Sequence, residues 1–378
     1  MKAPYQWYQT GDLFYRAILS EIEKARESIR LETYIFDAGY PGDDIRKALL
    51  EALSRGVRVK VLLDAFGSIN LPSHYWNPVR TAGGEVAFFN PLIFSRFALR
   101  NHRKSLVCDN RVGFVSGFNI SSSETGDGVT HGWRDLGLRL TGPIVRDLAT
   151  SFERMFAIAQ FRHRQLPRLR LRRPRFLNRR QERGPIPSLL ASGPGGRDNT
   201  IMLALLRDLQ RARSIRIISA YFLPTRRIRK SLIRSARQGR DVQVITAGKT
   251  DVAMSRYAGR ALYHRLLKAG VSIQEYHAQI LHTKLIVADK VVYIGSANLD
   301  TRSLSINYEL LIRIEDGHLA QEAREIFKSY LPHCRKINPD LWGHSRSYWE
   351  KLLERVSHFL LARVDFLLAR RQISNMHR

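Results

Sequence analysis

Two histidine–lysine pairs occur at matching places in the two halves of the chain. Each copy has a His, a Lys two residues later, an Asp five residues after the Lys, and an Asn shortly beyond a pair of small residues. The residues are His102, Lys104, Asp109 and Asn119 in the first copy, and His282, Lys284, Asp289, Ser296 and Asn298 in the second. One such pair means little, but two full copies predict a single composite site.

These residue types suit a reaction at an anionic phosphorus centre. A neutral imidazole can attack phosphorus or move a proton near pH 7, and a lysine ammonium is a point charge for a phosphate oxygen. One histidine can therefore be the nucleophile while the other is the general acid for the leaving alcohol. Because the lysines supply positive charge, we expect no metal and no other cofactor. Asn119, Ser296 and Asn298 are candidate donors to the phosphate oxygens.

The sequence around each motif predicts a β-hairpin. Apolar and β-branched residues fill 105–107 and 112–115 in the first copy, and 285–287 and 291–294 in the second. Side chains two apart in a strand share a face, so each His lies beside its Lys. Asp109 and Asp289 fall at the turns, where we expect them to support the site rather than react. The competing interpretation is two unrelated hairpins with surface His and Lys.

The paired motifs resemble the His-Lys-Asp motifs of the phospholipase D superfamily. Within it, residues 281–309, 32–36 and 133–135 are similar to stretches of the bacterial cardiolipin synthases that lack N-terminal transmembrane helices. The resemblance covers roughly residues 8–340. It departs from the family at Ser116-Gly117, where Gly-Gly or Gly-Ser is common, and at the second turn, which is one residue tighter.

The resemblance implies phosphatidyl transfer through a phosphatidyl–histidine intermediate, with His102 as the nucleophile and His282 as the general acid. With phosphatidylglycerol as donor and acceptor, the products are cardiolipin and glycerol. Three alternatives are a lipid hydrolase that uses water, a nuclease of the same superfamily, and a basic binding protein with a vestigial site. The Leu, Phe and Trp content near the basic segments favours lipid over nucleic acid, and the presence of all six His, Lys and Asp residues argues against a vestigial site.

Helices and strands follow the same order in both halves. Four landmarks pair at offsets of 186, 183, 186 and 180 residues: Ser28 with Ser214, Gly56 with Gly239, Gly84 with Gly270, and His102 with His282. This duplication predicts an α/β fold of two pseudo-symmetric halves, each a mixed β-sheet flanked by helices, with the active site between them. We expect the first half over residues 1–160, an arginine-rich linker over 161–195, the second half over 196–335, and a basic amphipathic helix over 336–378.

Particular elements follow from hydrophobic spacing and from glycine positions. Expected helices cover residues 11–28, 45–54, 201–211, 228–237, 261–268 and 345–371, and expected strands cover 29–36, 57–63, 86–89, 215–222, 242–247 and 271–276. Residues 67–80 read as a loop. The aromatic stretch 88–103 is either a lip where a lipid enters or part of the core.

The charge indicates an anionic partner. The chain of 378 residues has a formal net charge of +28, which favours an acidic membrane surface or nucleic acid. We expect an anionic phospholipid, phosphatidylglycerol, as substrate and no nucleic acid partner; the sequence does not set the oligomeric state. Ten arginines lie in residues 161–183, a segment that is either a solvated linker or an adhesive for anionic headgroups.

The sequence also gives an expectation for the cellular location of the protein. The start has no apolar signal-peptide core, no run of about 18 apolar residues occurs, and two unpatterned cysteines fit a reducing compartment. We expect peripheral binding on the cytoplasmic side of the bacterial inner membrane, through residues 161–183 and 345–371, with binding that weakens in salt.

We predict turnover without added divalent metal. Dialysis of the purified protein against a chelator should leave the rate of product formation unchanged, because Lys104 and Lys284 supply the charge that a cation supplies elsewhere. Loss of turnover that only Mg²⁺ or Zn²⁺ restores would contradict this mechanism.

Overall fold

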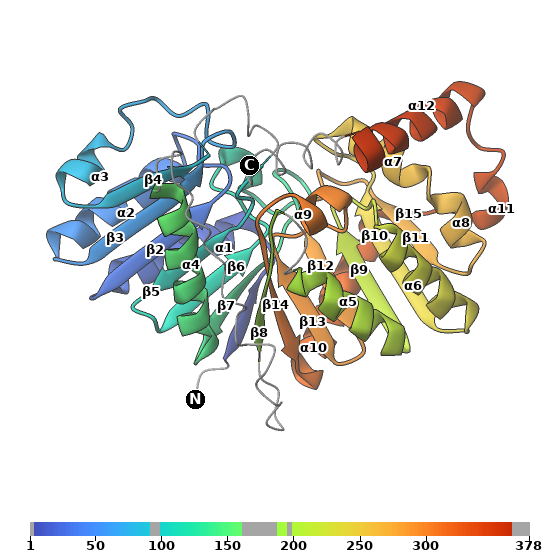
Figure 1. The fold of residues 1–378 in the computed structure, drawn as a ribbon, viewed down its shortest axis with the longest axis horizontal. Coiled ribbons are helices and arrows are strands. Elements are labelled where there is room, and N and C mark those ends of the chain that lie inside the picture. Colours follow the sequence, from blue (N-terminus) through green and yellow to red (C-terminus); the bar gives the residue numbers. More distant parts are fainter. Residues whose placement is uncertain (1–3, 91–98, 161–186, 195–198, 365–378) are drawn as a thin grey trace, which may run out of the picture.

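Two halves lie side by side in the computed structural model of the chain, each built on one β-sheet (Figure 1). The structure describes residues 4–90, 99–160, 187–194 and 199–364. Most of the predicted linker, and the end of the predicted late helix, lie outside these residues. The boundaries expected for the linker and the two halves therefore stay predictions.

The first half contains a seven-stranded mixed sheet with the order β1-β7-β6-β5-β2-β3-β4. Its strands are β1 Tyr5–Tyr8, β2 Ser28–Thr33, β3 Arg58–Asp64, β4 Glu85–Phe89, β5 Ser105–Cys108, β6 Val112–Ser116 and β7 Gly137–Thr141. Its helices are α1 Gly11–Lys24, α2 Gly42–Ser54, α3 Asn77–Thr81 and α4 Ile144–Gln160. The short helix α3 falls at the end of the stretch expected to be a loop. The strands β2, β3 and β4 are parallel and the other pairs are antiparallel.

The second half contains an eight-stranded sheet with the order β15-β11-β10-β9-β12-β13-β14-β8. Its strands are β8 Ser188–Ser192, β9 Ser214–Ser219, β10 Asp241–Ala247, β11 Ser272–Tyr276, β12 Lys284–Ala288, β13 Val291–Gly295, β14 Glu309–Glu315 and β15 Cys334–Lys336. Its helices are α5 Thr200–Arg211, α6 Arg226–Arg237, α7 Ala253–Arg260, α8 Tyr263–Leu267, α9 Thr301–Ser305, α10 Gly317–Tyr330, α11 Pro339–Trp342 and α12 Tyr348–Phe359. The helix expected over 261–268 corresponds to α8, and α7 precedes it where no helix was expected.

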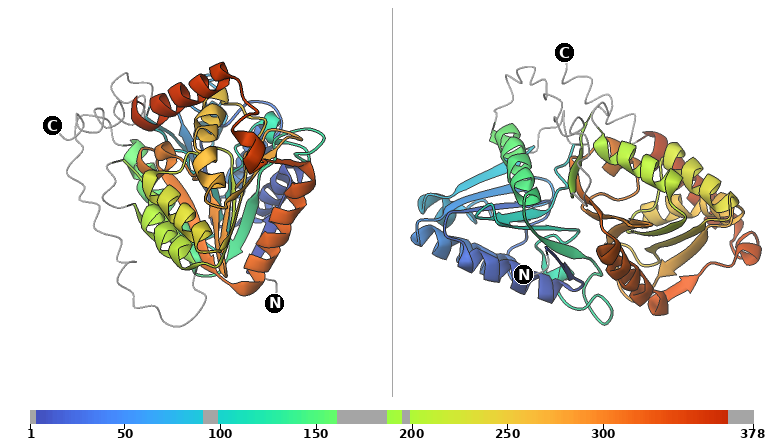
Figure 2. Two further views of the ribbon diagram at one scale, coloured as in Figure 1. Left: turned by 90° about the vertical axis from the view of Figure 1, so that its right-hand side faces the viewer. Right: turned by 90° about the horizontal axis from the view of Figure 1, so that it is seen from below.

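The two sheets match strand for strand. The order β1-β7-β6-β5-β2-β3-β4 corresponds to β8-β14-β13-β12-β9-β10-β11, and β15 is added at the outer edge of the second sheet. Helices cover both faces of each sheet, with α1 and α2 opposite α4, and α5 and α6 opposite α10 (Figure 2). The predicted duplication and the mixed α/β fold are therefore confirmed.

One apolar cluster crosses the boundary between the halves. Strand β13 contacts both β6 and β7 there. The cluster includes Val107, Val115, Leu138, Ile144 and Leu148 from the first half, and Ile218, Leu285, Ile294, Leu310 and Ile312 from the second. Burial of an aliphatic side chain stabilises a fold by about 1.5–3 kcal/mol, so this shared core fixes the two halves against each other and brings the two motif hairpins together.

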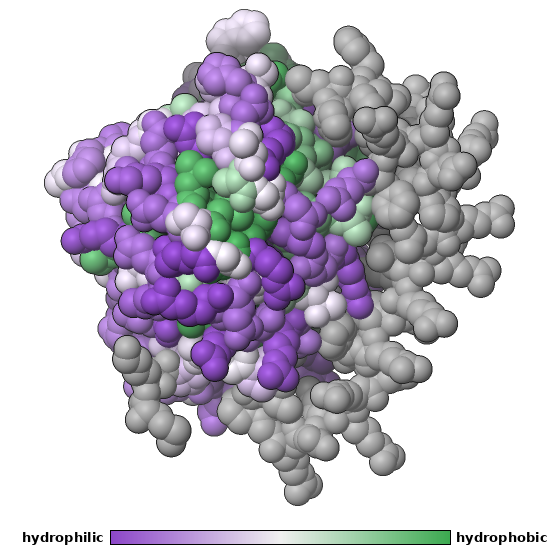
Figure 3. All heavy atoms as spheres, turned by 90° about the vertical axis from the view of Figure 1, so that its left-hand side faces the viewer, coloured by the Kyte–Doolittle hydropathy of each residue, from purple (hydrophilic) through white to green (hydrophobic). Residues whose placement is uncertain are grey.

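The outer surface of the first half, on the left-hand side of Figure 1, is mainly hydrophilic with one central apolar patch (Figure 3). Within the described residues, no helix combines the length and the apolar character needed to cross a bilayer.

Candidate active site

The structure places both His/Lys pairs in one site at the boundary between the halves. His102 and Lys104 lie at the start of β5, and His282 and Lys284 lie at the start of β12. The two pairs are close enough to act on each other, because Lys284 lowers the pKa of His102 and Lys104 lowers the pKa of His282, in both cases after the larger effect of burial. The duplicated motif therefore forms one cluster rather than two separate surface hairpins.

A carboxylate from the opposite half holds each histidine. Nδ1 of His102 lies 3.1 Å from a carboxylate oxygen of Glu309, the first residue of β14. Nδ1 of His282 lies 2.6 Å from Oδ2 of Asp135, two residues before β7. Each half thus supplies a histidine to the site and the acid that orients the other half's histidine.

Main-chain hydrogen bonds repeat this crossing. The N–H of His102 donates to the carbonyl oxygen of Tyr308 over 3.0 Å, and the N–H of His282 donates to that of Arg134 over 2.8 Å. Isolated parallel bridges between the same segments accompany both bonds. Because each acid directly follows the residue that accepts the bond, the backbone alone sets the position of each His against its acid.

The electrostatics favour neutral histidines with the proton on Nδ1. Burial lowers the pKa of His102, and it lowers the pKa of His282 well below its usual value. Burial would raise the pKa of Glu309, but His102 and Lys104 outweigh it and the net shift is downward. Burial raises the pKa of Asp135 to about 6, so both acids are ionised at pH 7. An ionised carboxylate only accepts hydrogen bonds, so Nδ1 donates and Nε2 keeps a lone pair for chemistry.

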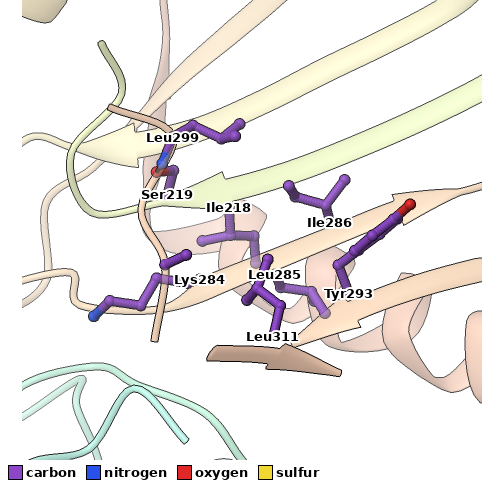
Figure 4. Close-up of a pocket in the computed structure, with 9 residues that line it drawn as sticks. Ile218, Ser219, Lys284, Leu285, Ile286, Tyr293, Leu299 and Leu311 are labelled. Carbon is purple, nitrogen blue, oxygen red and sulfur yellow. Dashed lines mark hydrogen bonds between the residues drawn. The ribbon is translucent and has the colours of Figure 1, made fainter. Parts of the chain in front are cut away.

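The two lysines are buried and repel each other. Nζ of Lys104 donates to the carbonyl oxygen of His102 over 2.8 Å, and Nζ of Lys284 donates to that of His282. Burial lowers the pKa of both ammonium groups, and the charge of Lys284 lowers that of Lys104 further. The side chain of Lys284 borders a small apolar cavity, with its ammonium pointing away from the other lining residues (Figure 4). The acids Glu309, Glu124 and Asp135 offset part of this charge, because they raise the pKa of both lysines. Two cations close together also suit a bound anion such as a phosphate diester.

Asp109 and Asp289 do not reach the histidines. The Asp109 carboxylate accepts from the backbone N–H groups of Arg26, Glu27 and Ser28 at 2.7–2.9 Å. The Asp289 carboxylate accepts in the same way at the start of β9. Both Asp residues have positive φ angles, of 53° and 50°, in turns at the far end of the motif strand. They anchor each hairpin to the neighbouring strand, which agrees with the supporting role expected for them. Their inclusion among the catalytic residues stays a prediction.

Two of the side chains expected to donate hydrogen bonds to the substrate phosphate form hydrogen bonds within the protein. Nδ2 of Asn119 donates to Glu124 and its Oδ1 accepts from the N–H of Ile35, while Oγ of Ser296 donates to Glu309. Both side chains orient buried groups of the site, and their expected role as donors to the substrate stays a prediction. Oδ1 of Asn298 accepts from the N–H of Tyr221, and its role toward the substrate stays a prediction.

Among the described residues, one buried group has metal-ligand geometry. Ligand atoms of Glu124, Asp135 and His282 lie within 4.8 Å of one another. Hydrogen bonds already engage these atoms, since Asn119 donates to Glu124 and His282 bonds Asp135. Nζ of Lys284 lies 3.6 Å from Asp135 and supplies positive charge at the same place. The residues present fit a hydrogen-bonded network better than a cation, and the metal-free mechanism stays a prediction.

Residue patterns alone did not identify the carboxylates that hold the histidines. Glu309 and Asp135 lay within stretches that resemble the family, but the spacing gave them no role. Aromatic rings also pack on the histidines, Tyr34 on His102 at 4.9 Å and Trp133 on His282 at 5.3 Å between ring centroids. A usable signal was the strand that follows each motif hairpin, β7 in the first half and β14 in the second, because an acid lies within two residues of its start in both copies.

Comparison with known proteins agrees with this geometry. Residues 18–156 and 205–331 match the family described as "Cardiolipin synthase, PLD-like domain". Cardiolipin synthase A of Pectobacterium carotovorum subsp. carotovorum (strain PC1) is 30% identical over 365 residues, which cover 94% of this chain and 74% of that protein. Cardiolipin synthase B of Escherichia coli (strain K12) is 30% identical over 353 residues, which cover 91% and 84%.

The fold has a solved counterpart. Phosphatidylserine synthase of Haemophilus influenzae Rd KW20 superimposes with a TM-score of 0.74 over 97% of this chain and 95% of that one, at 14% identity. The fold and the paired motifs define a two-half protein of the phospholipase D superfamily. Within that superfamily, the chain belongs to the cardiolipin synthase family.

We predict that both crossed acids are needed for turnover. Glu309→Gln and Asp135→Asn keep the side-chain shape but remove the ionised acceptor that fixes the Nδ1–H tautomer. The fall in kcat/KM should be on the order of 10²–10⁴-fold, as for the buried acid of a catalytic triad. Glu275→Gln is the matched control, because it removes a buried carboxylate paired with Arg260 outside the site. Equal rates in the three variants would refute the role of the acids.

We predict that each lysine is essential for rate and not for folding. Lys104→Met and Lys284→Met should each lower kcat by roughly 10²–10³-fold, as loss of a preorganised charge does. Thermal unfolding should show little change in stability, because each variant loses the attraction of a buried acid but also the repulsion between the two lysines. Lys60→Met, which removes a partly buried cation paired with Glu153, controls for the substitution itself. Near-normal turnover in both site variants would count against a shared site.

Proposed function

We propose that this chain transfers a phosphatidyl group from one phospholipid to another through a phosphatidyl–histidine intermediate, forming cardiolipin and glycerol from two molecules of phosphatidylglycerol. The observation that carries the proposal is the pair of neutral imidazoles, each held by an acid of the other half, beside two buried lysines. The family of the chain and the names of its relatives support the choice of lipid.

The first step uses the two histidines in different protonation states. Nε2 of His102 attacks the phosphorus of the donor lipid, and the bond between phosphorus and the glycerol oxygen breaks. His282 gives a proton to that oxygen, so glycerol leaves as a neutral alcohol. The bound phosphodiester raises the lowered pKa of His282, since a nearby negative charge favours the protonated form. Lys104 and Lys284 stabilise the charge that develops on the non-bridging oxygens.

The second step reverses these roles. His282, now neutral, takes a proton from the hydroxyl of the acceptor lipid while the hydroxyl oxygen attacks phosphorus. The bond between phosphorus and His102 breaks, and the enzyme returns to its starting state. Assignment of His102 as nucleophile follows the superfamily resemblance and is supported by exposure, because 12% of its side chain is accessible against 4% for His282.

We also propose that the protein works at the cytoplasmic side of the bacterial inner membrane as a peripheral protein. The net charge of +28 supports contact with an anionic leaflet. The segment 161–183, expected to contribute to this contact, lies outside the described residues. No nucleic acid partner is part of the proposal.

The test is a product analysis. The purified protein is incubated with vesicles of phosphatidylglycerol labelled in the headgroup glycerol, and lipids and soluble products are resolved. The expected result is one labelled glycerol released for each cardiolipin formed, and none of either with Lys104→Met. Phosphatidic acid with glycerol, and no cardiolipin, would instead show a hydrolase. Failure to turn over lipid, together with cleavage of an oligonucleotide, would show a nuclease.

We predict that covalent trapping distinguishes the two histidines. Rapid quenching with acyl-labelled donor should give no labelled enzyme for His102→Ala. His282→Ala should still acquire label, slowly, and fastest from a donor with a good leaving group that needs no general acid. Label on His282 in the His102→Ala enzyme would reverse the assignment.

A further inference from the structure

The apolar face of α12 points away from the protein. Tyr348, Trp349, Leu352, Val356 and Phe359 follow one another at helical spacing and all are exposed, with 73% of Trp349 and 58% of Phe359 accessible. A helix on the surface of a water-soluble domain normally shows the opposite arrangement, with its apolar stripe against the core. Large apolar side chains gathered on one exposed face mark a site of interaction.

Polar side chains make the inner face of the same helix. Glu354 and Ser357 are buried, and Arg346 pairs with Glu354 over 2.5 Å. The helix packs on α7, and a capping box formed by Ser347 and Glu350 begins it. A fixed start and a buried ion pair hold the helix in this orientation, so the outward direction of its apolar face is built into the fold.

The second half also exposes apolar side chains beside the active site. Val252 and Met254 are exposed at the start of α7, which carries α12. Both closely follow Asp251 in the sequence, whose charge acts on His282 and Lys284. Exposed apolar side chains therefore occur on α12 and also at the start of α7, the helix on which α12 packs.

The first half contributes a similar pair. Phe66 and Ile69 are exposed in the segment between β3 and α3. The guanidinium of Arg100 lies 4.1 Å from the Phe66 ring centroid, two residues before His102. Exposed apolar side chains thus occur near the motif of each half.

We propose that the outer face of α12, together with these neighbouring apolar residues, docks on an anionic phospholipid surface and lies among the headgroups with the active site facing the leaflet. Tyr and Trp side chains suit this interface, because they combine an apolar body with a polar edge. Lys351 and Arg355 lie on α12 itself, where their long side chains can reach lipid phosphates. The inference rests on the proposed function, because a phosphatidyl transferase must take its substrates from a bilayer.

The charge and the rest of the surface favour a membrane over a protein partner. The excess of +28 charges matches an anionic leaflet. The outer surface of the first half is mainly hydrophilic around one central apolar patch (Figure 3), so most of this side suits contact with water. Insertion of α12 thus gives the protein one lipid-facing and one water-facing side.

Vesicle binding of the full chain tests the proposal without turnover. His102→Ala protein, which is inactive under the proposed function, is mixed with phosphatidylglycerol vesicles and sedimented. Adding Leu352→Ser, Val356→Ser and Phe359→Ser should lower the partition coefficient at least tenfold. The matched control is Leu13→Ser, Leu203→Ser and Leu341→Ser, which removes equally exposed side chains from α1, α5 and α11 and should bind as the parent does. Equal binding by the two triple variants would overturn the proposal.

A second measurement uses the native helix and does not depend on the folding of a variant. Phospholipids brominated near the headgroup should quench Trp349, and Trp349→Phe should lose that part of the quenching. Unchanged quenching in Trp349→Phe would overturn the inference.

Sedimentation velocity without lipid should show that the α12 substitutions leave the oligomeric state unchanged. If the substitutions instead dissociate a dimer, a second copy of the chain covers this face and the inference is overturned. If α12 binds vesicles but the protein forms no cardiolipin, the docking surface is supported and only the proposed function is rejected.

Discussion

The crossed pairing of each histidine with an acid of the other half is the constraint on which the site depends. His102 gains its acceptor from β14, and His282 gains its acceptor from the segment before β7. In the described residues, neither half supplies both members of a His–acid pair of the site, so the duplicated halves must pack together before either imidazole is oriented. The shared apolar cluster around β6, β7 and β13 supplies that packing, which links the stability of the boundary directly to the chemistry.

The same boundary buries two lysines together with the acids that offset part of their charge. Two lysines with lowered pKa values stand beside two histidines with lowered pKa values, and burial is the largest cause in every case. A phosphodiester between them replaces the lost water with a counter-ion. The negative charge of the phosphodiester raises the pKa of the general acid, so that this histidine is protonated when the substrate is bound. The same charge both binds the substrate to the lysines and activates the site.

Sequence reasoning reached the parts of the structure that repeat or that follow local rules. The motif strands, the duplication and the mixed sheets followed from alternation, from matched glycines and from the paired His and Lys. The positions of Glu309 and Asp135 did not follow, because their partners come from the other half and the crossing depends on how the sheets meet. The hydrogen bonds of Asn119 to Glu124 and of Ser296 to Glu309 did not follow either, because they are tertiary contacts. The amphipathic pattern near the C-terminus was visible in the sequence, but only the structure shows that its apolar side faces outward.

The account is tested most directly by ¹⁵N NMR of the histidine side chains. His102→Ala and His282→Ala identify the two resonances of interest among the 12 histidines. At pH 7 in the absence of lipid, both imidazoles should be neutral with the proton on Nδ1. Glu309→Gln should perturb His102, and Asp135→Asn should perturb His282. An imidazolium or an Nε2–H tautomer in the wild-type protein, or a His102 signal that responds to Asp135→Asn and not to Glu309→Gln, would contradict the crossed pairing.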